Sequence, residues 1–195
     1  MLAPLGAQTD APPQVSTSAV AAVKALGEQV VLQKYQVAID RMYPQWKEKM
    51  AKGEGGMARL EAKLAGIGKT MAEQGVSLIS FRPVGEPITY EVESGMEKVE
   101  ENGRIIEKMI FRKWMLLIPT ETKYRITKPR DGEESAKPIV ITTTGFQVAI
   151  SEKGKNDWTF IDGASISVPE LRRMFFTLPD NMTLPPIKRK SSEAN

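Results

Sequence analysis

Hydrophobic side chains change their spacing along this chain at Gly75. Before this glycine they recur every third or fourth position, as on one face of a helix, and after it every second position, as on one face of a strand. Amphipathic helices followed by half-buried strands are typical of an α+β domain. The sequence therefore predicts N-terminal helices packed on a curved, cone-like antiparallel sheet.

Three stretches before Gly75 have the helical spacing. Their apolar positions are Val20, Val23, Leu26 and Val30, then Tyr35, Ile39, Met42, Trp46 and Met50, and then Met57, Leu60, Leu64, Ile67 and Met71. One of the hydroxyl residues at 16–18 can cap the first helix with its side-chain oxygen. Pro44 lies inside the second stretch, where its missing N–H and its ring predict a kink or a restart near Tyr43.

The second half of the chain carries the strand signals. Strands are predicted at 76–82, 88–93, 104–118 and 122–126, and in a long hairpin that spans 138–162. The 104–118 stretch is apolar on both faces and is expected to be the central strand, with Pro119 at its end or at a bulge. After the hairpin, Ser167 and Glu170 have the spacing of a capping box, which predicts a short C-terminal helix through Phe176.

Composition divides the chain into one domain and two tails. We expect residues 1–15 to form a disordered leader or tether, residues 16–186 a single α+β domain, and residues 187–195 a disordered basic tail. The segment at 2–8 resembles the end of a cleaved export signal, so we expect an exported protein, periplasmic or extracellular. A leader on a cytoplasmic protein is the alternative that the sequence leaves open.

The absence of histidine and cysteine removes several chemistries. Structural zinc sites, thiol nucleophiles and Ser-His-Asp relays all need one of these residues, and we predict neither a metal nor a cofactor. The 27 basic and 24 acidic residues are mixed along the chain, with no basic cluster before 188–190, so nucleic acid is not an expected partner. No apolar run approaches the ~20 residues of a membrane-spanning helix, so no transmembrane segment is predicted.

Two segments resemble the nuclear transport factor 2-like and ketosteroid isomerase-like superfamily, a cystatin-like α+β cone. They read AIDRMYP at 38–44, with Trp46 following, and DWTFIDG at 157–163. The likeness is to exported bacterial members and extends over roughly residues 18–186. It implies helices that cover the concave face of the sheet and a pocket at the open end of the cone. It does not extend to the tyrosine and aspartate constellation of the isomerase, which has no residue-by-residue match here.

Asp40 and Tyr43 are the candidate catalytic residues. They stand three positions apart on the second predicted helix, where a buried carboxylate could act as a base and a phenol as a hydrogen-bond donor. The alternative is that Asp40 lies on the wet face of this helix. Ligand pockets are mainly apolar, and the aromatic candidates for lining one are Tyr35, Trp46, Tyr90, Trp114 and Tyr124.

These patterns favour a non-catalytic ligand-binding or protein-interaction module. Its expected partner is a small apolar ligand in the cone, a second copy in a homodimer through the exposed sheet face, or another envelope protein. The alternative is a small isomerase-like or dehydratase-like enzyme that uses Asp40 and Tyr43 in the cone pocket. An enzyme needs Asp40 buried beside an open cavity, whereas a binding module can leave this residue in water.

Overall fold

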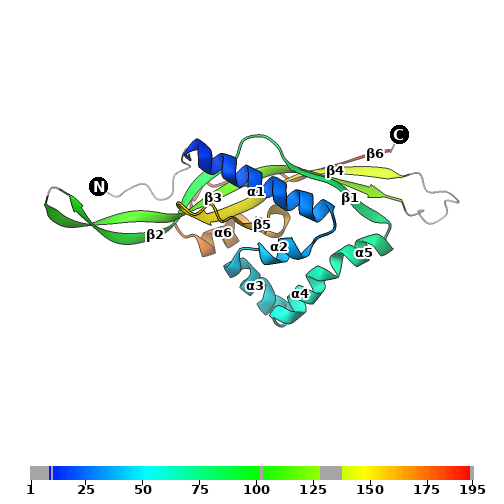
Figure 1. Cartoon of the computed structure of the whole chain (residues 1–195), viewed down its shortest axis with the longest axis horizontal. Coiled ribbons are helices and arrows are strands. Elements are labelled where there is room, and N and C mark those ends of the chain that lie inside the picture. Colours follow the sequence, from blue (N-terminus) through cyan, green and yellow to red (C-terminus); the bar gives the residue numbers. More distant parts are fainter. Residues whose placement is uncertain (1–8, 10, 102, 128–137, 194–195) are drawn as a thin grey trace.

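In the described part of the chain, a six-stranded antiparallel sheet, curved and unclosed, forms the body of the protein, and five α-helices precede it (Figure 1). The computed structural model describes residues 9, 11–101, 103–127 and 138–193. The α-helices are α1 (Pro13–Val31), α2 (Gln36–Asp40), α3 (Pro44–Glu54), α4 (Met57–Ala65), α5 (Ile67–Glu73) and α6 (Val168–Met174), and a 3-10 helix, η1, spans Gly163–Ser165. The strands are β1 (Val76–Pro83), β2 (Ile88–Glu101), β3 (Arg104–Ile126), β4 (Ile139–Glu152), β5 (Thr159–Asp162) and β6 (Lys188–Glu193). This order confirms the predicted α+β class.

The central strand, β3, has 23 residues and runs through Pro119. One of its edges pairs with β2 and then with β1, the other pairs with β4, and the far edge of β4 is shared by β5 and β6. The carbonyl of Pro119 accepts a hydrogen bond from the N–H of Val84 at 2.8 Å. Because the N and C=O of one strand residue point to the same side, the missing N–H of Pro119 faces the junction between β2 and β1. No ladder bond is lost there, and the strand continues where the sequence predicts its end.

The first helix begins earlier than predicted. α1 starts at Pro13, whose missing N–H costs nothing in the first turn. Residues 13–15 therefore belong to the domain and not to the expected leader, and residues 1–8 and 10 lie outside the described part of the chain. Ser18, a predicted cap, lies inside the helix, where its Oγ accepts a hydrogen bond from the indole N–H of Trp158 at 2.9 Å. This bond ties α1 to the residue before β5.

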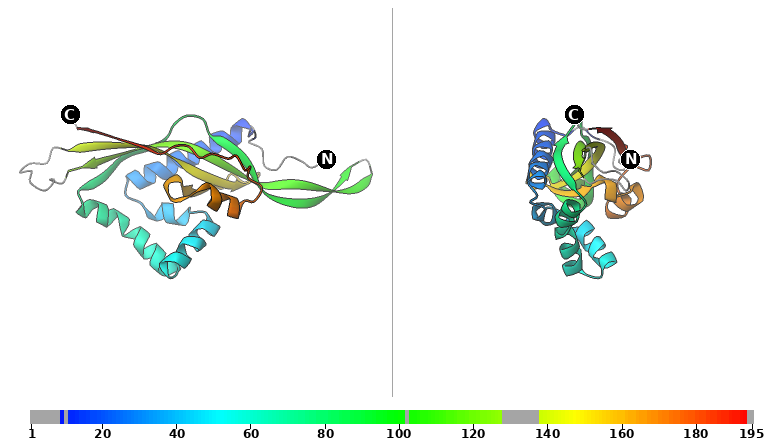
Figure 2. Two further views of the ribbon diagram at one scale, coloured as in Figure 1. Left: turned by 180° about the vertical axis from the view of Figure 1, so that it is seen from behind. Right: turned by 90° about the vertical axis from the view of Figure 1, so that its right-hand side faces the viewer.

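The predicted break near Pro44 is confirmed, because α2 and α3 are separate helices on either side of Tyr43. The N–H of Tyr43 donates to the carbonyl of Phe160 at 2.9 Å, and the N–H of Phe160 donates to the carbonyl of Arg41 at 2.7 Å. The link between the helices thus pairs with the free edge of β5. A second break, which the sequence analysis missed, separates α4 from α5 at Gly66. These two helices lead from the end of α3 back to the start of β1 (Figure 2).

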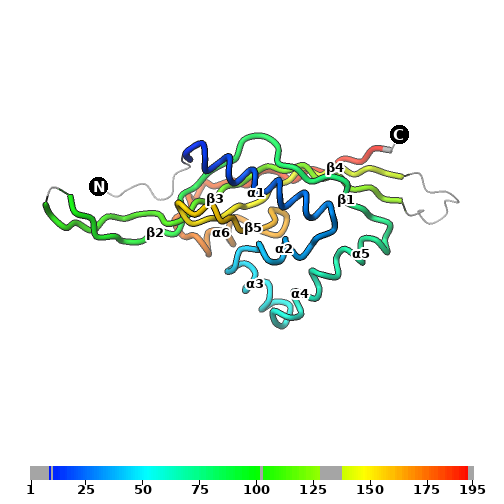
Figure 3. Tube along the Cα trace, viewed as in Figure 1, coloured from blue at the N-terminus to red at the C-terminus, as the bar shows by residue number. Residues whose placement is uncertain are grey.

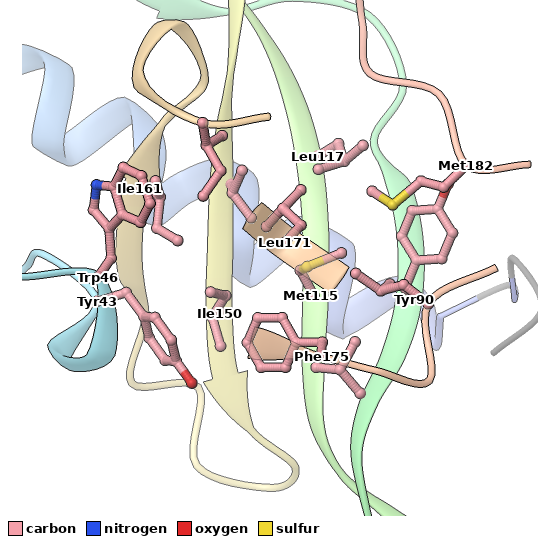
Figure 4. Packing of buried hydrophobic residues seen from close by; sticks show 14 of the residues in the cluster. Tyr43, Trp46, Tyr90, Met115, Leu117, Ile150, Ile161, Leu171, Phe175 and Met182 are labelled. Carbon is pink, nitrogen blue, oxygen red and sulfur yellow. The ribbon is translucent and has the colours of Figure 1, made fainter. Parts of the chain in front are cut away.

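Both faces of β3 and β4 are buried in the middle of the sheet. Successive strand residues point to opposite faces, so Leu116 packs on one side and Leu117 on the other, each without exposed surface. The first side is covered by α1, through Ala19, Val23 and Leu26. The second side is covered by α6 and the segment after it, through Leu171, Phe175, Leu178 and Met182 (Figure 4). The central sheet therefore has two hydrophobic cores, which we call the α1-side core and the α6-side core.

The end of the chain forms a strand where the sequence predicts a disordered basic tail. The capping box before α6 is as predicted, since the N–H of Ser167 donates to the Glu170 carboxylate at 2.9 Å. Further on, Lys188–Glu193 pairs as β6 with residues 139–144 of β4. The side chains at 188–192 are exposed, so the pairing depends on backbone hydrogen bonds. The sequence here therefore lacks the hydrophobic alternation that would predict a strand. Residues 194 and 195 lie outside the described part.

β2 and β3 extend beyond the rest of the sheet as a two-stranded arm (Figure 3). Their register continues to the pair of Glu101 with Arg104, whereas β4 accompanies β3 only from Lys113 onward. The arm carries the exposed hydrophobic residues Met96, Ile105, Ile106 and Met109. An isolated two-stranded ribbon is only marginally stable in water, so the arm depends on its continuity with the covered part of the sheet.

Candidate ligand-binding site

A cavity of about 390 Å³ lies between the helices and the α1 side of the sheet. We call it the helix–sheet cavity. Its helical wall consists of Leu26, Val30, Tyr35, Ala38, Met42, Trp46, Met50, Leu64, Ile67 and Met71. Its floor consists of Leu78, Phe81, Thr122, Tyr124, Gln147, Phe160, Asp162 and Ser165. The wall is apolar apart from the hydroxyl of Tyr35, and the other polar side chains are on the floor.

Strand register explains why these floor residues share one face. Directly paired residues of neighbouring strands point to the same side of a sheet. Tyr124 of β3 pairs with Leu78 of β1, and Gln147 of β4 pairs with Asp162 of β5. Gln147 also pairs with Ile118 of β3, an α1-side residue. The floor therefore lies on the same face of the sheet as the α1-side core and continues it.

The far wall of the cavity is held close by a glycine. An ideal Cβ built on Gly68 of α5 would stand only 2.3 Å from a ring carbon of Tyr35. The ring of Tyr35 therefore packs directly on the backbone of α5, at a distance that any side chain would prevent. This contact joins the segment before α2 to α5 and closes the wall between them.

Asp162 is the polar centre of the floor. The amide of Gln147 donates a hydrogen bond to its Oδ1 at 3.4 Å. The residue as a whole is exposed to solvent, although its carboxyl lines the helix–sheet cavity and is partly buried by the residues around it. This burial raises the pKa of the Asp162 carboxyl, and a hydrogen bond from the backbone N–H of Ala164 opposes the rise. Burial also raises the pKa of the Tyr124 hydroxyl, and the Asp162 charge adds to the increase.

Replacing Asp162 by Asn is expected to stabilise the protein at neutral pH. Because the folded pKa is raised, the ionised carboxylate costs stability above that pKa, and the cost disappears as the pH falls toward the unfolded value near 3.8. Thermal unfolding should therefore give a higher midpoint for Asp162→Asn at pH 7, and a difference that shrinks toward zero below about pH 3.8. Asp40→Asn, on an exposed helix surface, is the matched control. An advantage of the same size at both pH values would contradict the assignment.

The structure places some of the predicted aromatic residues in the cavity and others elsewhere. Tyr35, Trp46 and Tyr124 line it. Tyr90 instead lies in the α6-side core, with 4% of its surface exposed. Trp114 packs at the margin of the α1-side core, where the Lys153 ammonium lies 4.4 Å from the centre of its ring.

The structure does not bring Asp40 and Tyr43 together in the cavity. Asp40 is exposed, and its Oδ1 accepts a hydrogen bond from the amide of Gln36 at 2.8 Å. Tyr43 is buried on the opposite side of β5, with its ring centre 5.7 Å from that of Phe175 (Figure 4). Burial raises the pKa of its hydroxyl, and the nearby Lys113 ammonium opposes the rise. The pair therefore lacks the common pocket that acid–base chemistry would need.

The sequence analysis missed the polar floor residues Asp162, Gln147, Thr122 and Ser165. A signal for Asp162 was present, because it stands two positions after Phe160 in a predicted strand and so shares its face. Gln147 has no such signal, since its neighbours in β4 are buried on both faces. Its place in the cavity follows only from its register with β5.

A second hollow, about 810 Å³, lies at the base of the arm. Charged residues dominate its lining, and four of them form two ion pairs, Lys113 with Glu93 and Lys153 with Glu91. The helix–sheet cavity has an apolar wall and one carboxylate without a cationic partner among the described residues, so it is the better candidate.

Comparison with protein-family models, with curated proteins and with solved structures finds no match to this chain. No helix in the described ranges has both the length and the apolar character to cross a bilayer.

Proposed function

We propose that the protein is a non-catalytic binding module that holds a small, elongated apolar molecule in the helix–sheet cavity. The observation that carries the proposal is the lining, in which an apolar helical wall faces a floor with a few polar groups. Its volume, about 390 Å³, falls in the range of roughly 300–1,000 Å³ for ligand pockets. Met42, Met50 and Met71 give the wall a shape that can adapt, because methionine is unbranched and flexible.

The charges at the cavity favour binding over catalysis. Asp162 is the one charged residue among the described lining side chains, and the expected catalytic residues Asp40 and Tyr43 are not part of that lining. A lone carboxylate beside Tyr124 and Gln147 suits a hydrogen bond to one polar group of an otherwise apolar ligand. An exposed Asp40 is compatible with a binding module, whereas the alternative enzyme would need this residue buried beside the cavity.

We also propose that the chain is exported and that it is an α+β cone of the nuclear transport factor 2-like kind. The order of elements, helices before a curved antiparallel sheet with a cavity between them, supports the second proposal. The composition of residues 2–8 supports the first. Mass determination of the N-terminal peptide from the native host tests export, since a cleaved protein would begin after these residues.

Binding of the apolar dye N-phenyl-1-naphthylamine tests the proposed site. The dye is expected to bind saturably, with a rise in fluorescence. Met71→Trp should raise its dissociation constant about tenfold or more, a loss of about 1.4 kcal/mol, because the larger ring fills the cavity. Met71 is partly buried on α5 and faces this open space, so the variant is expected to fold.

Met96→Trp is the matched control, since Met96 is exposed on the arm. It should leave the dissociation constant of the dye unchanged. A loss of affinity in Met96→Trp but not in Met71→Trp would move the site to the arm and overturn the proposal. Equal affinity in both variants and the unmodified protein would also overturn it.

A further inference from the structure

The final strand places an arginine beside the helix–sheet cavity. Arg189 of β6 pairs with Thr143 of β4, and Thr143 pairs with Thr122 of β3. Paired residues share a face of the sheet, and Thr122 lines the cavity. Arg189 is therefore on the cavity side of the sheet. Its neighbours Lys188 and Lys190 pair with residues 144 and 142 and point to the other side.

The strip of β4 between Arg189 and the cavity floor carries no large β4 side chain on its cavity face. On the cavity face of β4, Thr143 is followed by Gly145 and Gln147. A Cβ built on Gly145 would have only one near neighbour, Ile187 Cγ1 at 3.9 Å. No bulky side chain of β4 therefore separates the guanidinium from the floor. A ligand in the cavity can extend a polar end along this strip.

The charge of Arg189 is not neutralised by an ion pair within the described residues, and its side chain is exposed. Its influence nevertheless reaches the floor, because it lowers the pKa of the Tyr124 hydroxyl against the other effects there. Asp162 and Arg189 both act on the Tyr124 hydroxyl, and their effects on its pKa are opposite. An anionic group would be repelled by the first and attracted by the second.

We propose that the ligand is a single-chain amphiphile with an anionic head, with its apolar body in the helix–sheet cavity and its head on Arg189. This inference rests on the proposed binding function and names the class of ligand. The planar guanidinium can hold a carboxylate or a phosphate through two parallel N–H donors. The apolar wall accepts the chain.

The same arrangement makes β6 part of the site. The side chains at 188–192 are exposed, so the strand is held to β4 mainly by backbone bonds. A head group bound to Arg189 adds a contact between β6 and a ligand anchored in the cavity. Binding of an anionic amphiphile is therefore expected to protect the backbone amides of β6 from hydrogen exchange, whereas a neutral ligand of equal length leaves them unprotected.

Decanoate, decyl phosphate, decanol and decylamine, compared by displacement of N-phenyl-1-naphthylamine at pH 8, test the head group. Decanoate or decyl phosphate should bind about five- to tenfold more tightly than decanol, and decylamine no more tightly than decanol. Whichever of decanoate and decyl phosphate binds more tightly identifies the head group as a carboxylate or a phosphate. Arg189→Ala should remove the preference for the anion and leave decanol binding unchanged.

Lys190→Ala removes the same charge from the same strand but on the opposite face, and it should retain the anion preference. Equal binding of decanoate, decyl phosphate and decanol by the unmodified protein would overturn the inference while leaving the proposed function in place. An equal loss of preference in Lys190→Ala and Arg189→Ala would reduce Arg189 to a general surface charge and would also overturn it. Failure of all four ligands to displace the dye would refute the inference, and failure of the dye itself to bind would refute the proposed function.

Discussion

Leu116→Ala and Leu117→Ala are each expected to lower the free energy of unfolding by about 2–5 kcal/mol, although the two leucines are neighbours in one strand. Both have no exposed surface. Leu116 packs in the α1-side core, and Leu117 packs in the α6-side core. Each truncation removes apolar contacts and leaves a cavity that the surrounding side chains fill only in part. Similar losses on the two faces are the signature of a sheet covered on both sides.

Urea unfolding of each variant and of the double variant measures these losses. The two losses should add to within about 0.5 kcal/mol, since the side chains point to opposite faces and share no cavity. Met96→Ala, on the exposed arm with 57% of its surface in water, is the control and should change the free energy by less than about 0.5 kcal/mol. A negligible loss for Leu117→Ala would show that α6 and the segment after it do not cover the sheet in solution.

The double cover also explains which parts of the fold were predictable from the sequence. The change of period at Gly75 reports the boundary between helices and strands, because it depends only on side chains within each element. The apolar character of 114–118 on both faces likewise marks the covered part of a central strand, whereas 104–109 lie in the exposed arm. The continuation of β3 through Pro119 depends on which edge partner ends there, and this is decided by β1 and β2, which come earlier in the chain.

The candidate site was harder to predict for a related reason. Where both faces of a sheet are buried, alternation identifies two faces but does not tell which of them opens into a cavity. Tyr90 and Tyr124 are both strand aromatics with raised hydroxyl pKa values due to burial, yet only Tyr124 lines the cavity. The difference arises from the helices above each face. Trp46 and Tyr35 were predictable as apolar helix positions, whereas Asp162 required the register of β5.

β6 could not be predicted from the hydrophobic pattern of the sequence. A strand at a sheet edge can be stabilised by backbone hydrogen bonds while its side chains remain in water, and it then has neither the alternation nor the composition of a buried strand. The basic residues 188–190 are typical of a solvated tail. Only the pairing of Arg189 with Thr143 shows which of these side chains lies on the cavity face of the sheet.

Gly27→Ala is expected to destabilise the protein by about 1–3 kcal/mol, although alanine is the better helix former. Gly27 lies within α1, where an ideal Cβ would stand 2.2 Å from a ring carbon of Phe81 and 2.7 Å from its carbonyl oxygen. The ring could turn aside, but the carbonyl belongs to β1 and can move only with the strand. α1 would therefore have to retreat from the sheet. Because Phe81 lines the helix–sheet cavity, the affinity for N-phenyl-1-naphthylamine should fall as well.

Gly53→Ala provides the matched comparison, since Gly53 is also a helical glycine but has no atom within 4 Å of its ideal Cβ. There the gain in helix propensity acts alone and should stabilise the protein by roughly 0.5–1 kcal/mol. The two substitutions have the same chemistry and opposite expected signs, so urea unfolding of both separates backbone propensity from the close approach of α1 to β1. Stabilisation by Gly27→Ala would mean that α1 lies farther from β1 in solution. The described contact between α1 and Phe81, and with it the described shape of the cavity, would then be wrong.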